Sequence, residues 1–376
     1  MKLAIVRQTY NPHGGAERFV ERALAALSKE RSVQLSVIAR RWQPQAGVEF
    51  VECDPPWRTS LTRDRGFASA VRSLLDAEPG RFDLVQSHER IPGVTLYRAG
   101  DGVHAAWLER RARAVGRVKR ALMAADPYHR YVLGAERAMF THPALEAVIC
   151  NSRMVAGEID AHFGVAARKI VVIGNAVDLE RFHPRLRGGR DAVRAALQVP
   201  ADAPVFLHAG SGFERKGVAQ ALRALARVPH AWLWVAGGDK REARYRRLAQ
   251  ELGVAARTLF LGPRDDLPQL LGAADAFVLA TLYDPMPNAA IEALACGLPL
   301  ITTTGCGAQE LVEPGRNGFV VDALDTAALT EAMATLARPG AAASMGDAAR
   351  AAVANLTAAQ MVARLKTLYE HLLARQ

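Results

Sequence analysis

The sequence predicts an α/β protein built from two doubly wound parallel sheets. Short apolar runs alternate with helical patterns along nearly the whole chain, as they do when each buried strand is followed by a covering helix. A length of 376 residues suits two domains of ordinary size. A linker-like stretch around 174–190 interrupts the alternation, so we place the domain boundary there, between 1–175 and 176–357.

The first domain is expected to contain a series of strands with helices between them. The apolar runs that predict these strands are 2–8, 33–39, 48–52, 82–87, 94–99, 147–151 and 169–173. Helices are expected at 16–28, at 67–77 and from Ser152 onward. Gly14 and Gly15 form the turn before the first helix and allow a backbone to approach a ligand. That turn lacks the glycine spacing of a dinucleotide site, which argues against a two-domain dehydrogenase.

The second domain shows the same alternation. Its apolar runs predict strands at 205–209, 231–236, 258–261, 276–280 and 298–302. Helical patterns fill 325–376, and the last of them spans 357–374.

The composition is that of a soluble globular enzyme, with 50% hydrophobic and 23% charged residues. No apolar run reaches the roughly 18 residues of a membrane span, and the N-terminus enters a strand pattern without a cleavage site, so we expect a cytoplasmic protein. The formal net charge of +10 indicates an anionic partner: a nucleotide, a phosphorylated substrate, an acidic membrane or nucleic acid. The cysteines are scattered, so we expect them to be reduced and buried, without a zinc site.

The most informative stretch runs from Tyr283 to Ile301, where a polar loop and a short helix lie between two apolar runs. Seven residues separate Asp284 from Glu292. This spacing places one carboxylate on the loop and the other inside the helix, on the face of Asn288. Glu292 interrupts an otherwise apolar helix, where a charge is usually paired or functional. A solvated helix residue and a turn aspartate are the alternative interpretation.

The first turn of this helix is expected to bind an anion. Its N–H groups without intrahelical partners and the helix dipole favour a diphosphate at that position. The donors would be Asn288, Ala289 and Ala290, and the small alanines allow close approach.

A second phosphate-binding element is predicted at Gly210–Gly217, directly after a strand. It contains Arg215 and Lys216 on a glycine-rich loop. Arginine offers planar bidentate contacts and lysine a point charge, which together suit a diphosphate. The alternative interpretation is a pair of solvated surface residues. The loop, however, follows the carboxyl end of a predicted strand, and Asp284 also follows a predicted strand.

A third candidate follows the strand at 94–99, where two glycines flank Asp101. Doubly wound sheets form their sites at this carboxyl edge. Asp101 is equally well explained as a turn or cap residue, and His104 as a histidine in the first turn of a helix.

The segment 107–131 is strongly basic. Between Trp107 and Met123 it carries six cations and one acid beside several apolar residues, and two tyrosines follow. A basic amphipathic helix of this kind suits an anionic membrane surface, but an ordinary surface helix whose apolar stripe faces the core fits equally well. Nucleic acid is not expected as a partner, because stacking aromatics and a binding fold are not evident.

These motifs resemble the retaining, nucleotide-sugar-dependent glycosyltransferases of family 4, which have the GT-B fold of two Rossmann-like domains facing a cleft. The resemblance rests on the acidic-x7-acidic signature at Asp284 and Glu292 and on the Gly-x-x-x-x-Arg-Lys-Gly loop that ends at Gly217. Asp284 stands where glutamate is usual. The segment from Arg90 to His104 resembles the bacterial lipopolysaccharide core glucosyltransferases.

The resemblance implies a role for each donor-side residue. Asp284 orients hydroxyls of the donor sugar and Glu292 holds the ribose. Arg215 and Lys216 stabilise the departing diphosphate. Asn288, Ala289 and Ala290 belong to the same nucleotide-sugar site. Domain 176–357 is therefore implied to bind the donor, without a metal or a cofactor.

Domain 1–175 is implied to bind the acceptor, and the last helix, about 358–376, to cross back onto it. Asp101 would act on the acceptor, with His104 as a substrate contact. Further substrate contacts are implied in the glycine-rich turns, at Gly14, Gly15, Gly210, Gly238 and Arg264.

The expected function is that of a metal-independent hexosyltransferase, which moves glucose from UDP-glucose to a heptose of the lipid-anchored lipopolysaccharide inner core. Other donors stay open, namely UDP-GlcNAc, UDP-galactose or a GDP-sugar, with an undecaprenyl-linked or other glycolipid acceptor. A non-catalytic nucleotide-sugar-binding protein is a more distant alternative. We expect a cytoplasmic monomer that associates peripherally with the inner face of the cytoplasmic membrane.

Overall fold

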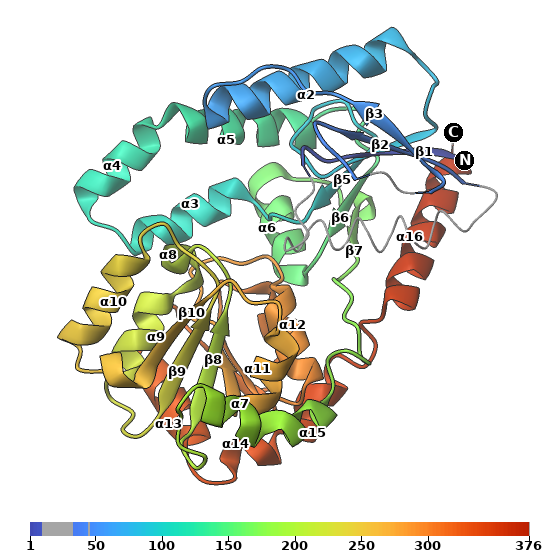
Figure 1. Ribbon diagram of the computed structural model, residues 1–376. Coiled ribbons are helices and arrows are strands. Elements are labelled where there is room, and N and C mark those ends of the chain that lie inside the picture. Colours follow the sequence, from blue (N-terminus) through green and yellow to red (C-terminus); the bar gives the residue numbers. More distant parts are fainter. Residues whose placement is uncertain (10–32, 44–45, 376) are drawn as a thin grey trace. The chain divides into compact units, whose positions relative to one another are not determined.

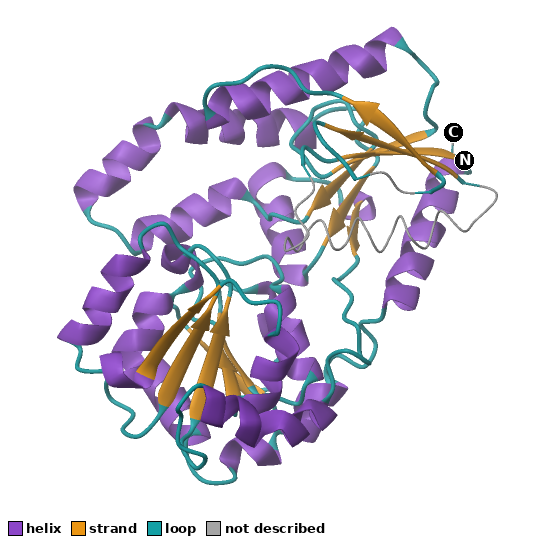
Figure 2. Cartoon of the chain, viewed as in Figure 1, coloured by secondary structure: helices purple, strands orange, loops and turns teal. Residues whose placement is uncertain are grey.

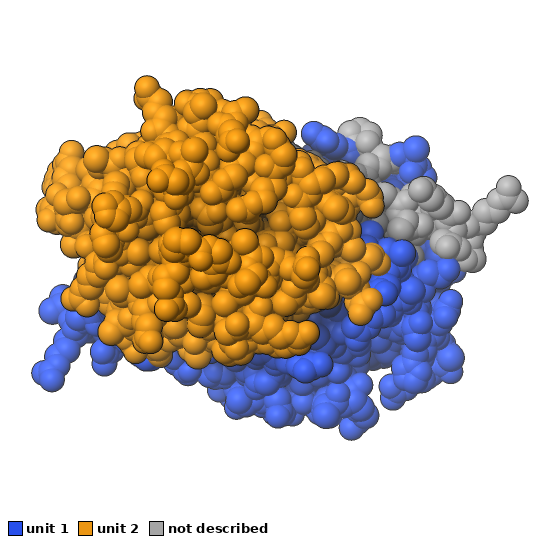
Figure 3. Space-filling model, turned by 90° about the horizontal axis from the view of Figure 1, so that it is seen from below, with its two compact units in different colours: residues 1–176, 358–376 blue, residues 177–357 orange. Residues whose placement is uncertain are grey.

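The computed structural model describes residues 1–9, 33–43 and 46–375, which form two compact units. Unit 1 comprises Met1–Ala176 and Ala358–Gln376, and unit 2 comprises Val177–Thr357 (Figure 3). The expected helix at 16–28 and the turn with Gly14 and Gly15 lie outside the described residues.

Unit 1 is organised around a parallel sheet, whose described strands follow the order β3-β2-β1-β4-β5-β6-β7 (Figure 1). The strands are β1 (Lys2–Val6), β2 (Gln34–Ala39), β3 (Val48–Glu52), β4 (Leu84–Ser87), β5 (Leu96–Ala99), β6 (Ala147–Cys150) and β7 (Ile170–Val172). Each lies within a predicted apolar run. Because β2 and β4 lie on opposite sides of β1, the carboxyl ends of β1 and β4 form a topological switch point, where such sheets bind ligands.

Both faces of this sheet are buried, as the continuous apolar runs predict. Leu3 and Ile5 belong to one hydrophobic cluster, whereas Ala4 and Val6 belong to another on the opposite face. Helices cover the faces (Figure 2). The described helices of unit 1 are α2 (Ser60–Ala77), α3 (His104–Arg113), α4 (Arg117–Ala125), α5 (Pro127–Phe140), α6 (Arg153–Phe163), the 3-10 turn η1 (Ala167–Lys169) and α16 (Ala358–Leu373).

The C-terminal helix α16 belongs to unit 1, as predicted. Leu365 and Tyr369 are buried in the cluster that also contains Ile5 of β1. The Tyr369 hydroxyl donates a hydrogen bond of 2.7 Å to Oε1 of the buried Gln86. The last residues of the chain thus complete the core of its first domain.

The basic segment 107–131 corrects one expectation, because it forms parts of three helices and not a single one. Gly116, with ψ at 165°, interrupts the helical path before α4. Asp126 is extended before Pro127, which disfavours helical conformation in the residue preceding it. Asp126 then caps α5 by accepting a hydrogen bond of 2.8 Å from the Tyr128 N–H.

Unit 2 contains a second parallel sheet, with the order β10-β9-β8-β11-β12-β13. The strands are β8 (Val205–Ala209), β9 (Trp232–Ala236), β10 (Thr258–Gly262), β11 (Ala276–Val278), β12 (Leu300–Thr303) and β13 (Gly318–Val321). The last of these was not among the predicted strands. The switch point of this sheet lies between β8 and β11.

The helices of unit 2 again cover two buried faces (Figure 2). They are the 3-10 turn η2 (Pro184–Gly189), α7 (Arg190–Ala196), α8 (Phe213–Lys216), α9 (Val218–Leu225), α10 (Glu242–Glu251), η3 (Ala255–Arg257), α11 (Leu267–Ala273), α12 (Asn288–Ala295), η4 (Gly307–Leu311), α13 (Thr326–Leu336), α14 (Ala341–Ser344) and α15 (Gly346–Ala351).

Part of the predicted linker is ordered secondary structure, namely η2 and the start of α7. Polar composition is misleading here, because the arginines pair with a partly buried carboxylate. Arg190 pairs with Asp275 at 2.7 Å, and the Arg194 guanidinium, 1% exposed, pairs with the same carboxylate at 2.8 Å. These ion pairs attach the segment to unit 2.

The four cysteines are buried and free, as predicted. Burial raises the pKa of the Cys150, Cys296 and Cys306 thiols to about 12. In the part of the chain that the structure describes, no helix combines the length and apolar character needed to cross a membrane.

Candidate active site

The carboxyl edge of the unit 2 sheet carries the predicted phosphate-binding residues. Arg215 and Lys216 lie on the one-turn helix α8, which corrects the expectation of a flexible loop. The turn is anchored because the Phe213 side chain is fully buried, and its N–H donates to Asp239 Oδ2 at 2.8 Å. The two cations are therefore held in place before any ligand arrives.

Two glycines make room for this turn. Gly217 has φ at +78°, and a Cβ there would lie 1.8 Å from the carbonyl oxygen of Ala280. A Cβ on Gly210 would come within 3.1 Å of Lys216 Cε. Gly217 is thus required by conformation and by space, and Gly210 leaves the path of the lysine side chain open.

Asp284 joins the two cations. Its Oδ2 accepts a hydrogen bond from Lys216 Nζ and lies 3.3 Å from Arg215 Nη1, which also donates to the Tyr283 carbonyl at 3.0 Å. Asp284 is only 5% exposed. Burial opposes its ionisation, but the positive charges of Lys216 and Arg215 outweigh burial and lower the pKa of Asp284. The site therefore contains an ionised carboxylate between two cations.

The helix α12 follows this loop and begins after Pro287. The cap residue Pro287 makes no side-chain capping hydrogen bond, and a helix N-terminus favours an anion. Ala290 differs from the prediction, because its N–H already donates to the Pro287 carbonyl at 3.2 Å. Asn288 and Glu292 lie four residues apart on one face, and Glu292 is 2% exposed.

The remaining donor-side candidates lie on neighbouring turns of the same edge. The Gly238 N–H, after β9, donates to Ser211 Oγ at 3.3 Å, which joins this turn to the one after β8. Arg264, after β10, pairs within its own loop with Asp266, Nε lying 2.7 Å from Oδ1. Gly238 thus supports the phosphate-binding turn, whereas the charge of Arg264 is satisfied locally.

In unit 1, the carboxyl edge of the sheet contains a polar cavity of about 500 Å³. Its lining residues come from the ends of five neighbouring strands and from two helices. Those that follow strands include Arg7 and Gln8 after β1, Arg40 after β2, Asp54 and Trp57 after β3, Glu89 and Arg90 after β4, and Asp101 after β5. The cavity therefore extends across the switch point between β1 and β4.

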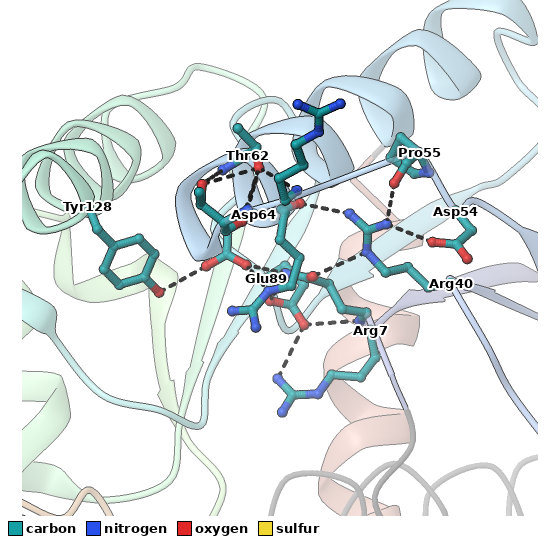
Figure 4. Close-up of polar contacts among 12 residues, drawn as sticks. Arg7, Arg40, Asp54, Pro55, Thr62, Asp64, Glu89 and Tyr128 are labelled. Atoms are coloured by element: carbon teal, nitrogen blue, oxygen red, sulfur yellow. Dashed lines mark hydrogen bonds and ion pairs between the residues drawn. The ribbon is translucent and has the colours of Figure 1, made fainter.

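Charged side chains at the centre of this cavity form ion pairs and hydrogen bonds with one another (Figure 4). Arg7 Nη1 lies 3.3 Å from Glu89 Oε1 and 3.7 Å from Asp101 Oδ2. Glu89 Oε1 also accepts a hydrogen bond of 3.0 Å from the Gln8 N–H. Arg7 thus bridges two carboxylates from different strand ends.

Asp64, on α2, forms a second centre beside the first (Figure 4). It accepts hydrogen bonds from Arg63 Nε at 2.7 Å, from Gln8 Nε2 at 3.1 Å and from the Tyr128 hydroxyl at 2.9 Å. Burial opposes its ionisation, but these donors prevail and lower the pKa of Asp64. Burial and the Asp64 charge raise the pKa of Tyr128 to about 12, so the phenol keeps its proton and donates.

Asp101 is the most exposed of the carboxylates that line the cavity, with 52% of its side chain accessible. It lies in a turn held at both ends: the Gly102 N–H donates to Ala99 O at 3.3 Å, and Asn151 Nδ2 donates to Gly100 O at 3.1 Å. The backbone at Asp101 thus forms the predicted turn. The side chain of Asp101 lines the cavity.

His104 does not line the cavity. Its ring packs against His129, with His104 Nε2 and His129 Nδ1 separated by 3.1 Å. The backbone N–H of His104 donates a hydrogen bond of 2.7 Å to Glu136 Oε1. Burial, with smaller effects from the Arg90 and His129 charges, lowers the pKa of His104 to about 3. The imidazole is therefore neutral at physiological pH, and its position fits a structural role better than substrate contact.

Several cavity residues were not predicted from the sequence, among them Arg7, Trp57, Asp64, Glu89 and Tyr128. Glu89 carries a usable signal, because it follows a predicted strand at the edge where sites form. Asp64 and Tyr128 lie on helices, and only the tertiary structure brings them to this edge.

Two family models match the chain one after the other. The first, Glycosyltransferase Family 4, covers residues 13–181, and the second, Glycosyl transferases group 1, covers residues 189–352. With two parallel sheets and polar sites at their carboxyl edges, the class is that of a two-domain GT-B glycosyltransferase. The chain belongs to the glycosyltransferases that join a family 4 domain to a group 1 domain.

Two curated relatives show where the sequence similarity lies. The lipopolysaccharide core biosynthesis glycosyltransferase LpsE of Rhizobium meliloti (strain 1021) is 37% identical over 140 residues, which are 37% of this chain and 41% of LpsE. The match therefore spans less than half of that relative. The lipopolysaccharide glucosyltransferase WaaG of Escherichia coli (strain K12) is 24% identical over 330 residues, which are 85% of each chain.

Solved structures share the fold. A crystal structure of WaaG superposes with a TM-score of 0.81 at 22% identity, covering 96% of this chain and 98% of that one. Anabaena Alr3699/HepE in complex with UDP-glucose gives a TM-score of 0.73 at 20% identity, covering 98% and 100% of the two chains.

Proposed function

We propose that this glycosyltransferase is a retaining enzyme that moves glucose from UDP-glucose to a heptose of the lipid-anchored lipopolysaccharide inner core. The observation that carries the proposal is the cluster of Lys216, Arg215 and Asp284 beside the first turn of α12. A nucleotide sugar presents a diphosphate between a hydroxyl-rich sugar and a ribose, and this cluster offers cations, an ionised acid and a helix N-terminus at one edge.

The names of the relatives support the donor sugar and the acceptor in this proposal. WaaG is named as a lipopolysaccharide glucosyltransferase and LpsE for lipopolysaccharide core biosynthesis. The HepE structure contains UDP-glucose. These names point to glucose as the donor sugar and to the lipopolysaccharide core as the acceptor.

The charged groups suggest how the leaving group is stabilised. Negative charge develops on the diphosphate as the bond to the sugar breaks, and preorganised donors lower the energy of that state. Arg215 and Lys216 meet this charge together with the first turn of α12. The diphosphate then replaces Asp284 as their partner, so that Asp284 can orient the sugar hydroxyls while Glu292 holds the ribose. In this scheme no metal or cofactor is required.

The acceptor binds, in this proposal, in the cavity of unit 1. Asp101 is the most exposed carboxylate there, and Arg7 Nη1 lies 3.7 Å from its Oδ2. Asp101 orients the attacking hydroxyl. No carboxylate is assigned as a nucleophile, so the hydroxyl attacks from the side that the diphosphate leaves, which retains the anomeric configuration.

We also propose that α4 brings this cytoplasmic monomer to the inner face of the cytoplasmic membrane. Val118 and Leu122 lie four residues apart on one face of α4 and are 76% and 67% exposed. An apolar stripe that covers the core would be buried, so their exposure favours the membrane interpretation of the basic segment. Arg117 and Arg120 are exposed on the same helix and suit anionic lipid.

The test is release of UDP or GDP from a panel of UDP- and GDP-sugars in EDTA. Wild type is compared with Glu292→Ala and Lys216→Ala. We expect slow turnover of UDP-glucose by the wild type and its loss in both variants, followed by transfer to truncated lipopolysaccharide. Turnover of another donor would replace glucose in the proposal. Binding without turnover would indicate a nucleotide-sugar-binding protein, and neither binding nor turnover would refute the donor site.

A further inference from the structure

Trp57 lines the unit 1 cavity although it is one of only five large hydrophobic side chains that are exposed among the described residues. Its side chain is 51% accessible. The Arg63 guanidinium lies over the ring, 5.9 Å from the centroid, and Arg63 is itself held by Asp64 at 2.7 Å. A large aromatic surface is therefore presented at a polar cavity, where it gains little from burial in the protein core.

The loop that carries Trp57 is built to hold this position. Arg40, at the end of β2 and 3% exposed, pairs with Asp54 at 2.7 Å and donates to the Pro55 carbonyl at 2.6 Å (Figure 4). The same guanidinium donates to the Arg63 carbonyl at 2.7 Å, at the start of α2. A buried cation thus fixes the chain on both sides of Trp57, so the aromatic ring is preorganised.

The cavity is longer than one sugar ring. Trp57 follows β3 and Asp101 follows β5, and four strand spacings separate these strands in the order β3-β2-β1-β4-β5. At about 4.8 Å each, the spacings add up to roughly 19 Å along the sheet edge. The volume of about 500 Å³ also falls among cavities that bury a drug-sized ligand, which is the size of a disaccharide.

We infer that this cavity recognises two sugar residues of the acceptor, the reacting one at Asp101 and the next one stacked on Trp57. The inference rests on the proposed function. The apolar C–H face of a pyranose packs on the negative face of an aromatic ring, while its hydroxyls reach fixed carboxylates and arginines such as those of this cavity. Trp57 is therefore a specificity-determining residue, and it selects an oligosaccharide acceptor over a single sugar or an inositol.

The experiment compares two synthetic acceptors, a heptose methyl glycoside and a heptosyl-heptose methyl glycoside, with UDP-glucose as donor. Wild type, Trp57→Ala, Trp57→Phe and the control Phe50→Ala are assayed for KM and kcat by UDP release. Phe50 is a matched control because it is also an exposed aromatic, at 41%, but does not line the cavity. Binding of the disaccharide without donor is measured by calorimetry in parallel.

We expect Trp57→Ala to raise the KM for the disaccharide roughly tenfold with little change in kcat, and to leave the KM for the monosaccharide unchanged. Trp57→Phe should retain most of the affinity, and Phe50→Ala should behave as the wild type. An equal effect on both acceptors, or no effect on either, would overturn the inference. If the wild type turns over no donor, the proposed function fails by itself, and the binding titration still decides whether Trp57 contributes to disaccharide binding.

Discussion

Asp284 connects folding and chemistry at the scale of single residues. It is buried between two cations, and a buried charge that loses its partner is costly to the fold. Replacing Lys216 and replacing Asp284 should therefore change stability and turnover in different ways, because in the proposed function Lys216 stabilises the departing diphosphate whereas Asp284 orients the sugar.

Replacing Lys216 with alanine should lower the free energy of unfolding by about 1–3 kcal/mol, since Arg215 still partners Asp284. Turnover should fall by roughly 10²–10³, as when one donor to a developing anion is lost. Adding Asp284→Asn to this variant should recover stability but not turnover. Urea unfolding and UDP release measure the two effects. Recovery of turnover in the double variant would contradict the proposed role of Lys216.

His104 is a partly buried histidine whose protonation should make stability depend on pH. Its pKa in the folded protein is lowered from 6.5 to about 3, so the unfolded chain binds the proton more readily. Its contribution to stability is complete above pH 6.5 and declines as the pH falls toward 3. When the pH is lowered from 7 to 5, the free energy of unfolding of His104→Gln should therefore fall less than that of the wild type. Urea titrations at the two pH values measure this difference. His371→Gln is the control, because it removes a histidine that is exposed.

At the scale of elements, α4 is unusual because two of its apolar residues, Val118 and Leu122, face solvent beside exposed arginines, whereas Met123 is buried. The helix is separated from α3 and α5 by breaks at Gly116 and Asp126. It is therefore a short helix of its own, and its apolar residues are not part of a longer stripe that includes α3 or α5.

The variant Val118→Ser/Leu122→Ser should bind vesicles containing phosphatidylglycerol about 10- to 100-fold more weakly than the wild type, because two apolar side chains no longer enter the interface. Its unfolding should be unchanged, since both side chains are exposed. Leu324→Ser, a 38% exposed leucine of unit 2, is the matched control. Vesicle cosedimentation measures binding, and equal affinity of the double variant and the wild type would count against membrane attachment through α4.

At the scale of the whole molecule, unit 1 depends on the end of the chain. The helix α16 supplies Leu365 and Tyr369 to the core around β1, although more than 280 residues separate Gln86 from its hydrogen-bond partner Tyr369. The first domain is therefore incomplete until α16 has been synthesised.

Shortening the buried Leu365 to alanine should lower the stability of unit 1 by about 2–5 kcal/mol, through lost burial and the cavity left behind. Unit 2 should be little affected, because α16 belongs to the other unit. Limited proteolysis with mass spectrometry should then find earlier cleavage within 46–175 and none within 177–357. Leu324→Ser again serves as control, and uniform cleavage of both units would show that they unfold together.

All the described strands except β13, and the spacing of the Asp284 and Glu292 motif, could be predicted from the chain because their signals are local. Apolar runs mark the buried strands, and the spacing of Asp284 and Glu292 spans one loop and one helix turn. Local composition led to a wrong prediction of a linker where polar residues pair with a residue distant in the chain. Arg190 and Arg194 both pair with Asp275. Local composition also misled at α4, where a glycine and an Asp-Pro step break an otherwise continuous pattern.

The sequence by itself determined the two parallel α/β domains and the glycosyltransferase class, and it predicted the charged residues proposed for the donor side, because each depends on residues close together in the chain. Only the tertiary structure decided the cavity of unit 1, which we propose as the acceptor site. Its residues Arg7, Trp57, Asp64, Glu89 and Tyr128 come from strand ends and helices that no local pattern relates. They meet because parallel strands bring their carboxyl ends to one edge, and the order of the strands in the sheet decides which ends are neighbours.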